Sequence, residues 1–306
     1  MIDVLTGFAV VAVAILTGYI VGRIDLLGPQ GRYVLSRLCF FVLNPFLLFS
    51  VLSESDLSVL FSSLLPASAI TAAIVFVVFG LVARLAWRRS WAQTTVGALG
   101  AGYVNGNNIG IPIATYVLGN GALAAPILLF QLLVITPVVL AILDASTTSD
   151  ASFGRIMRRT LRNPMIIGAL LGVLVAAFDL DLPAIVMEPV HLLAGGSVPV
   201  LLVSFGMSLY GQRVLTQAGT RRDILLATAL KLLAMPVVAW ALGAFAFRLE
   251  GHALLAVVVL AALPSAQNVF NYAQRYGTGE VVARDIVFLT TLGCLPVLFG
   301  CALLLG

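Results

Sequence analysis

Long apolar stretches alternate with short polar breaks along the 306-residue chain. A helix that crosses a membrane needs about 20 mostly apolar residues. Cutting the apolar stretches at charged or Gly/Pro-rich breaks predicts an all-α integral membrane protein with ten transmembrane helices. The predicted helices cover residues 3–22, 32–52, 61–83, 93–117, 121–143, 164–178, 184–209, 223–247, 252–274 and 282–305.

One longer polar connection, residues 144–163, lies between the fifth and the sixth predicted helix. It divides the chain into a first five-helix repeat, residues 1–143, and a second, residues 164–306. The ten helices occupy most of the sequence and leave no room for a separate soluble domain. We therefore expect one membrane domain, with residues 144–163 as a cytoplasmic linker.

The composition agrees with a membrane protein, since 61% of the residues are hydrophobic, 10% are charged and the mean hydropathy is +1.10. Soluble domains have about 45–50% apolar and about 25% charged residues. So few charged residues cannot cover the surface of a water-soluble globule. The composition argues against a soluble enzyme, a nucleic-acid-binding protein and a disordered protein.

The basic residues lie almost entirely in one set of loops, with Lys231 and Arg248 as the two exceptions among 17. Basic loops face the cytoplasm in membrane proteins. The odd-numbered loops are therefore expected in the cytoplasm, and both chain ends outside. Their basic residues are Arg23, Arg32, Arg37, Arg84, Arg88, Arg89, Arg155, Arg158, Arg159, Arg162, Arg213, Arg221, Arg222, Arg275 and Arg284.

Prolines recur at matching positions in the two halves. Pro45 and Pro199 are 154 residues apart, and Pro112 and Pro264 are 152 residues apart. Because each half has an odd number of helices, the second copy enters the membrane upside down. The sequence therefore predicts a 5+5 inverted-topology repeat.

Amide side chains, glycine and proline interrupt the fourth and the ninth predicted helix at corresponding places. Such interruptions survive at membrane depth only where protein or a water-filled cavity surrounds them, and paired interruptions point to a transporter binding site. Hydrogen bonds that merely pack one helix against another are the alternative explanation. The candidate substrate-binding residues are Asn105, Asn107, Asn108, Gly110, Pro112, Pro264, Ser265, Gln267, Asn268, Asn271 and Lys231.

The candidate site favours a small organic anion. Pro112 and Pro264 each suit the first turn of a new half-helix, and a helix N-terminus attracts negative charge. All 13 acidic residues lie in loops or at helix ends, so a carboxylate-based proton relay or sodium site is not expected. Asn and carbonyl oxygens leave weak sodium binding open.

Lys231 is the only lysine and lies eight residues after Asp223, well inside a predicted helix. Its ammonium group has three possible roles: attracting the substrate, pairing with a freed backbone carbonyl, or extending to the membrane interface. The sequence leaves these alternatives open. For Gln131, Thr136 and Ser204, packing hydrogen bonds are a sufficient explanation.

We expect neither a cofactor nor a metal, because His191 and His252 stand near helix ends without a ligand set around them. The intramembrane aspartate pair, Ser–His pair or HExxH motif of an intramembrane enzyme is missing, so the chain is not predicted to be an enzyme. A passive anion channel is an alternative, since broken helices also build pores.

Five motifs together resemble the auxin efflux carrier family over the whole chain. They are Asn44-Pro45 at the second helix, Asn163-Pro164 at the sixth, Pro199–Leu209 in the seventh, Gly110-Ile111-Pro112, and Pro264–Gly277. Bacterial members of that family include proteins described as transporters of malonate or other organic acids. The resemblance implies a bile-acid-symporter-like fold in which helices 4 and 9 cross at their unwound centres, with one bundle as a scaffold.

The expected function is that of a secondary transporter that moves a mono- or dicarboxylate by alternating access. An exporter of an auxin-like aromatic carboxylate is an alternative, but plant members carry a long central loop where this chain has residues 144–163. The resemblance implies the inner membrane of a bacterium. Expected partners are the organic anion and the lipid bilayer, with no nucleic acid and with a homodimer left open.

Overall fold

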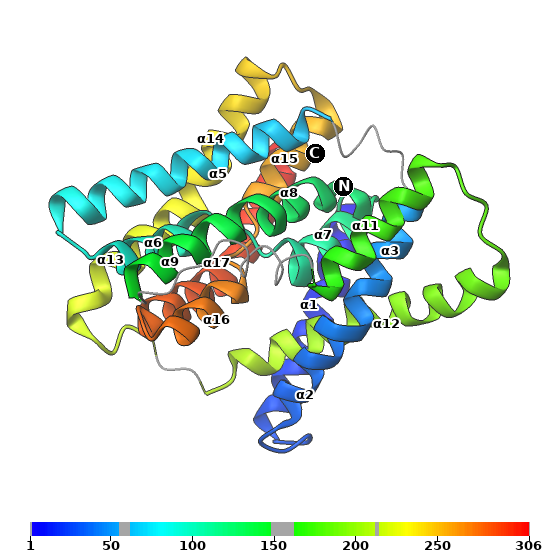
Figure 1. Cartoon of the computed structure of the whole chain (residues 1–306), viewed down its shortest axis with the longest axis horizontal. Coiled ribbons are helices and arrows are strands. Elements are labelled where there is room, and N and C mark those ends of the chain that lie inside the picture. Colours follow the sequence, from blue (N-terminus) through cyan, green and yellow to red (C-terminus); the bar gives the residue numbers. More distant parts are fainter. Residues whose placement is uncertain (1, 55–61, 148–161, 212–213, 306) are drawn as a thin grey trace. The chain divides into compact units, whose positions relative to one another are not determined.

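The computed structural model describes residues 2–54, 62–147, 162–211 and 214–305, and most of these residues are helical (Figure 1). The chain forms two compact units, each built from separate stretches of both predicted repeats. Most of the predicted linker 144–163 lies outside the described residues. Unit 1 comprises Met1–Ser62, Asn107–Pro126 and Arg158–Gln212, and unit 2 comprises Ser63–Gly106, Ile127–Met157 and Arg213–Gly306.

The helices of unit 1 come from the start and the middle of the chain. They are α1 (Ile2–Arg23), α2 (Gly31–Leu38), the π-helical turn η1 (Cys39–Leu43), α3 (Asn44–Ser53), α7 (Ile111–Tyr116), the 3-10 helix η4 (Gly121–Ala124), α11 (Pro164–Ala177) and α12 (Ala184–Leu209). The π-helical turn η3 (Gly106–Gly110) and α8 (Ala125–Phe130) run across the boundary between the units.

Unit 2 holds the other helices. They are α5 (Leu64–Leu81), η2 (Val82–Ala86), α6 (Trp91–Gly102), η5 (Gln131–Ile135), α9 (Thr136–Thr147), η6 (Ala218–Thr220), α13 (Arg221–Ala229), η7 (Leu230–Ala234), α14 (Met235–Ala241), η8 (Leu242–Ala246), α15 (Gly251–Ala261), α16 (Gln267–Tyr276) and α17 (Glu280–Leu305). Of these, η6 is a 3-10 helix, and η2, η5, η7 and η8 are π-helical.

Six helical segments among the described residues are long and apolar enough to cross a membrane, which makes the chain a multi-pass membrane protein. Shorter apolar helices at Ala12–Arg23, Pro164–Ala177 and Gly251–Ala261 fall within other predicted spans. That all ten predicted helices cross the bilayer stays a prediction. The six long segments are Gly31–Ser53, Leu64–Ala86, Gly121–Leu143, Ala184–Met207, Ala218–Ala246 and Glu280–Leu305.

Four of the π-helical turns are followed by one residue and then by a proline. Proline has no N–H to donate, and its ring clashes with the carbonyl four residues earlier in an α-helix. A wider π turn before the proline accommodates both effects, and such turns are frequent at functional sites. The four turns η1, η3, η5 and η7 are followed by Asn44-Pro45, Ile111-Pro112, Thr136-Pro137 and Met235-Pro236.

Each unit contains a pair of non-glycine residues with positive φ, and the two members of each pair are separated by a similar number of residues. In unit 1, Asp25 and Asp179 follow α1 and α11 and have φ values of 51° and 49°. In unit 2, Arg88 and Arg248 follow η2 and η8 and have φ values of 51° and 50°. Positive φ is uncommon for residues other than glycine, so these matching pairs are informative.

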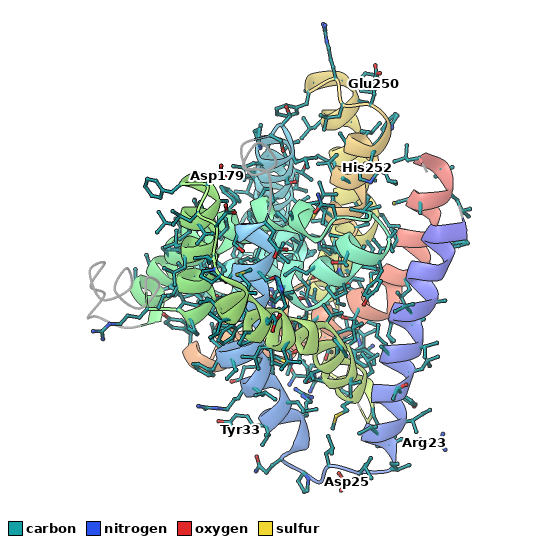
Figure 2. The ribbon with its side chains drawn as sticks, turned by 90° about the vertical axis from the view of Figure 1, so that its right-hand side faces the viewer. Arg23, Asp25, Tyr33, Asp179, Glu250 and His252 are labelled. Atoms are coloured by element: carbon teal, nitrogen blue, oxygen red, sulfur yellow. The ribbon has the colours of Figure 1, made fainter. Side chains whose placement is uncertain are left out.

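Polar and charged residues lie at both ends of unit 1 and at one end of unit 2. Figure 2 shows Arg23, Asp25 and Tyr33 at one end of unit 1 and Asp179 at the opposite end. Within unit 2, Glu250 and His252 lie together at one end. The positions in unit 1 agree with helices that run lengthwise through that unit.

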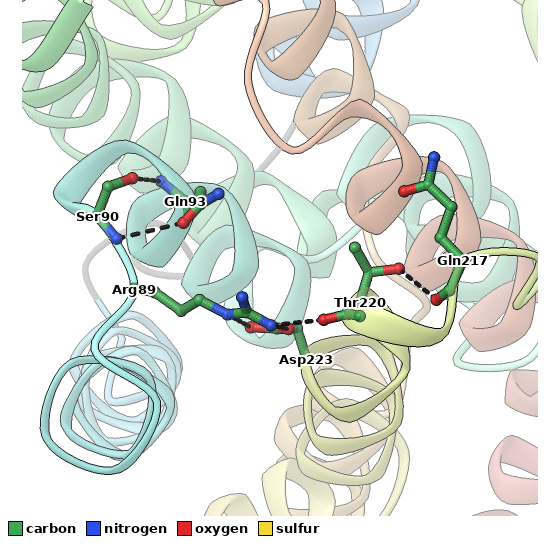
Figure 3. Close-up of polar contacts among 7 residues, drawn as sticks. Arg89, Ser90, Gln93, Gln217, Thr220 and Asp223 are labelled. Atoms are coloured by element: carbon green, nitrogen blue, oxygen red, sulfur yellow. Dashed lines mark hydrogen bonds and ion pairs between the residues drawn. The ribbon is translucent and has the colours of Figure 1, made fainter.

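An ion pair joins the starts of α6 and α13 in unit 2 (Figure 3). Arg89 contacts both carboxylate oxygens of Asp223, at 3.1 Å from Nε and 2.6 Å from Nη2, and Nη2 also donates to the Gly219 carbonyl at 2.7 Å. Ser90 and Gln93 form a capping box at the start of α6. This network fixes α6, which leads into the candidate site.

In unit 1, α1 and α12 approach backbone to backbone. A Cβ atom on Gly206 would lie 2.0 Å from the Ile15 carbonyl oxygen, and one on Gly18 would lie 2.1 Å from the Val203 carbonyl oxygen. Small residues allow such close packing between membrane helices. Glycine is therefore required at both positions.

We expect Gly206→Ala to lower the free energy of unfolding by about 1–3 kcal/mol, because the added methyl group forces α1 and α12 apart. A denaturant titration of the protein in detergent would measure the change. Gly195→Ala in the same helix is the matched control, since nothing lies within 4 Å of its added Cβ. Equal stability of the two variants would contradict the close helix contact.

Candidate functional site

Two breaks in the helices meet in unit 2. The first break, Tyr103–Asn105, follows α6, and the second, Ala262–Ala266, separates α15 from α16. The Asn105 N–H donates to the Pro264 carbonyl at 2.8 Å, and the Ala266 N–H donates to the Tyr103 carbonyl at 3.0 Å. The result is a single antiparallel bridge between Val104 and Ser265.

The side chain of Gln131, in the π turn η5, holds the centre of the first break. Its Oε1 accepts from the Val104 N–H at 2.6 Å, and its Nε2 donates to the Val104 carbonyl at 3.0 Å. One carboxamide thus satisfies both backbone groups of Val104, as a neighbouring strand would. Gln131 is 3% exposed, and a lost partner at such depth would be costly.

The centre of the second break is held by hydroxyl groups. The Ser265 N–H donates to Oγ1 of Thr290 in α17 at 3.1 Å. The Ser265 hydroxyl donates to the Gly100 carbonyl in the last turn of α6. Both Ser265 and Thr290 are fully buried, so their hydrogen bonds replace the helical ones that the break removes.

Lys231, in the π turn η7, reaches the carbonyl end of α15. Its ammonium Nζ donates to the Ala261 carbonyl at 3.0 Å and lies 2.9 Å from Sδ of Met235. The side chain is 0% exposed, so the interface alternative is wrong, whereas pairing with a freed carbonyl is confirmed. A role in attracting the substrate stays a prediction.

Polar side chains follow the second break along α16. Gln267 and Asn268 are half-buried in its first turn, and Asn271 is exposed one turn later. Asn268 lies beside the Tyr103 hydroxyl. Because α16 begins at Gln267, Pro264 precedes the half-helix. The prediction that Pro264 lies in its first turn is therefore wrong.

A cluster of hydroxyl groups adjoins Asn268. The Tyr103 hydroxyl is 3.1 Å from Oγ1 of Thr136, and that atom is 3.4 Å from the Tyr272 hydroxyl. Tyr103 and Thr136 are buried, at 2% and 7% exposure. The cluster gives this part of unit 2 several hydrogen-bond donors and no charge.

The remaining candidates after the first break belong to unit 1. Asn107 Nδ2 donates to Asn108 Oδ1 at 2.8 Å, and both side chains are half-buried in η3. Gly110 ends η3, and Pro112 lies in the first turn of α7, as expected. The half-helix itself resumes earlier than expected, since η3 already precedes α7.

The structure thus brings together Asn105, Pro264 and Ser265 directly, and Lys231 through the carbonyl end of α15. The packing hydrogen bonds expected for Gln131 are confirmed, but its partner, the backbone of Val104, was not predicted, and neither was the role of Thr290 at the second break. The available signal was the presence of a few polar residues, Gln131 with Thr136 and Thr290 with Thr291, in the two otherwise apolar helices that follow the broken ones along the chain. Within the described part of the chain, no group of three His, Cys, Asp or Glu residues could hold a metal.

The sequence is similar to known membrane transporters along nearly its whole length. The profile of the family described as "Membrane transport protein" matches residues 3–301. An "Uncharacterized transporter" of Methanothermobacter thermautotrophicus is 27% identical over 289 residues, which cover 92% of each chain. A "Putative malonate transporter" of Rhizobium meliloti is 24% identical over 285 residues, 91% of this chain and 88% of that protein.

A plant relative is similar over a shorter range. The "Probable auxin efflux carrier component 5b" of Oryza sativa is 30% identical over 152 residues, 48% of this chain and 41% of the plant protein. The matched region therefore spans less than half of that relative. The profile match over residues 3–301 establishes that this chain belongs to the membrane transport protein family, the family of the auxin efflux carriers.

Proposed function

We propose that this protein is a secondary transporter that moves a small organic anion, a mono- or dicarboxylate, by alternating access. The observation that carries the proposal is the pairing of the two broken segments, in which Asn105 bonds to Pro264 and Ala266 to Tyr103. Discontinuous helices that meet in this way build substrate sites in transporters. The family supports transport as the activity, in place of catalysis.

We further propose that the chain is a ten-helix, 5+5 inverted repeat with crossing helices 4 and 9. The matching φ values of Asp25 with Asp179 and of Arg88 with Arg248 support it, at offsets of 154 and 160 residues. Val104 and Ser265, which pair with each other, are 161 residues apart. Similar offsets in both units are expected if one five-helix unit was duplicated.

The proposed substrate is an anion because the surroundings of the second break supply hydrogen-bond donors and the N-terminus of α16. Such a terminus carries about half a positive charge. Gln267, Asn268, Asn271 and Asn105 are the proposed contacts there. Asn107, Asn108, Gly110 and Pro112 stay predictions from the sequence, and the name of the Rhizobium relative supports malonate as the first substrate to test.

We place the protein in the inner membrane of a bacterium, with the arginine-rich loops in the cytoplasm and both termini outside. The opposite ends of unit 1 that hold Arg23 and Asp179 support this orientation. The Arg89–Asp223 pair belongs to the proposed cytoplasmic side of unit 2. The positive-inside rule is the physical basis.

We expect purified protein in proteoliposomes to take up radiolabelled malonate, and Asn268→Ala to reduce uptake at low substrate by about 10–100-fold. A hydrogen bond to a charged group contributes about 1.5–3 kcal/mol, which corresponds to that factor. Asn108→Ala tests the contact predicted from the first break in the same assay. Initial rates should be compared for mono- and dicarboxylates, with and without Na⁺ and a pH gradient.

The control for Asn268→Ala is Gln217→Ala, since Gln217 is exposed and only its backbone carbonyl makes a described hydrogen bond. It should transport like the wild type. Undiminished uptake by both Asn268→Ala and Asn108→Ala would place the substrate elsewhere. Uptake of none of the carboxylates by the wild type would contradict the proposed function.

A carrier and a channel differ in their response to substrate on the far side of the membrane. We expect uptake to saturate and to accelerate when the vesicles are preloaded with unlabelled malonate, because each turnover returns one loaded site. Linear, unsaturable uptake with single-channel currents would instead identify an anion channel. Electrical recording and counterflow on the same preparation decide between the two.

A further inference from the structure

Lys231 is a fully buried ammonium group with two uncharged partners. It donates to the carbonyl of Ala261, the last residue of α15, and contacts Sδ of Met235. No carboxylate lies within ion-pair distance of it in the part of the chain that the structure describes. Burial of a charge is costly unless the charge is well paired, so its position calls for an explanation.

The carbonyl end of a helix supplies such a partner. At the end of α15, the Val258 carbonyl accepts from the Ala262 N–H and the Leu260 carbonyl accepts from the Leu263 N–H, whereas the Ala261 carbonyl accepts from Lys231. The last carbonyls of a helix carry the negative end of the helix dipole. Lys231 places a positive charge at this end, where α15 stops before the second break. The break then runs only from Ala262 to Ala266 before α16 begins at Gln267.

The corresponding position in the first half carries no charge. An offset of 160 residues, the one that relates Arg88 to Arg248, relates Lys231 to Thr71. Thr71 is also fully buried, but its hydroxyl donates to Ala67 in its own helix at 2.7 Å. The carbonyl end of α6 accepts instead from the Ser265 hydroxyl through Gly100. Among the residues that the structure describes, a lysine therefore supports the second break, and a serine hydroxyl bonds at the first.

We propose that Lys231 is a positioning residue for transport: its ammonium group holds the carbonyl end of α15 and so fixes where α16 presents Gln267 and Asn268 to the substrate. This rests on the proposed function and replaces a direct contact between Lys231 and the substrate. The geometry favours it because Lys231 has no exposed surface and its donors point to Ala261 and Met235. Lys231 therefore affects the geometry of the site without contacting the substrate.

The test compares Lys231→Met with wild type in proteoliposomes, using labelled malonate and labelled acetate. Methionine keeps the length of the side chain and removes its charge and its donors. We expect uptake of both anions to fall by the same factor, about tenfold or more. Met235→Leu is the control, because it leaves the bond to Ala261 in place and should keep uptake within twofold.

Two further measurements separate positioning from a general loss of structure. Amide hydrogen exchange in Lys231→Met should accelerate in a peptide covering residues 258–268 and stay unchanged in one covering residues 164–177, which form α11 in unit 1. Ethylammonium, but not tetramethylammonium, should restore part of the uptake in Lys231→Ala, because only the former can donate to the Ala261 carbonyl. A structural defect would respond to neither cation.

Several results would overturn the proposal. A larger loss for malonate than for acetate would make Lys231 a ligand of the second carboxylate, and unchanged uptake would remove it from the mechanism. Failure of both variants to fold, even with ethylammonium, would assign Lys231 to overall stability. If wild type and Asn268→Ala behave as proposed, any of these results leaves the proposed transport function intact. Conversely, the rate of amide hydrogen exchange in residues 258–268 tests the role of Lys231 even if no transported substrate is found.

Discussion

A backbone N–H or C=O group that leaves a helix in apolar surroundings needs a partner inside the protein, and this requirement organises unit 2. The two breaks provide some of these partners by pairing with each other at Val104 and Ser265. Further backbone groups at the breaks bond to three side chains from neighbouring helices, which are Gln131, Thr290 and Lys231. The broken helices are therefore held from several sides, and Gln267 and Asn268 lie half-buried directly after the second break.

Prolines help to place two of these three supporting side chains. Gln131 lies in η5 and Lys231 lies in η7, and both turns are π-helical. After the end of each turn comes one residue and then a proline. A π turn shifts the register of a helix, so a side chain that would face a neighbouring turn is redirected. The rule extends to unit 1, where Asn44 follows η1 and accepts from the buried Ser197 hydroxyl at 2.7 Å. Proline thus acts on the site through the turn that precedes it.

The sequence predicts the helical class, the membrane location and both interruptions, because these depend on local composition. Hydropathy identifies the helices, and amides beside Gly and Pro identify the breaks. The support for the breaks is not predictable in the same way, since Gln131 and Thr290 contact Val104 and Ser265, which lie far away in the sequence. Lys231 shows the same limit: its three possible roles differ only in what lies opposite the side chain, and that is a tertiary contact. The extent of the half-helices was also missed, because η3 begins before Pro112 and α16 after Pro264.

The pairing of the two breaks is tested most directly by a disulfide cross-link between cysteines introduced at Val104 and Ser265, in a background with Cys39, Cys294 and Cys301 replaced by alanine. Val104 and Ser265 form a bridge of the kind without direct hydrogen bonds, in which Cα atoms lie about 4.5 Å apart, close enough for a disulfide. The account predicts rapid oxidation of this pair in membranes. A control pair at Trp91 and Ser265, with Trp91 at the far end of α6, should not oxidise. Absence of the Val104–Ser265 cross-link, or equal oxidation of the two pairs, would contradict the meeting of the broken helices.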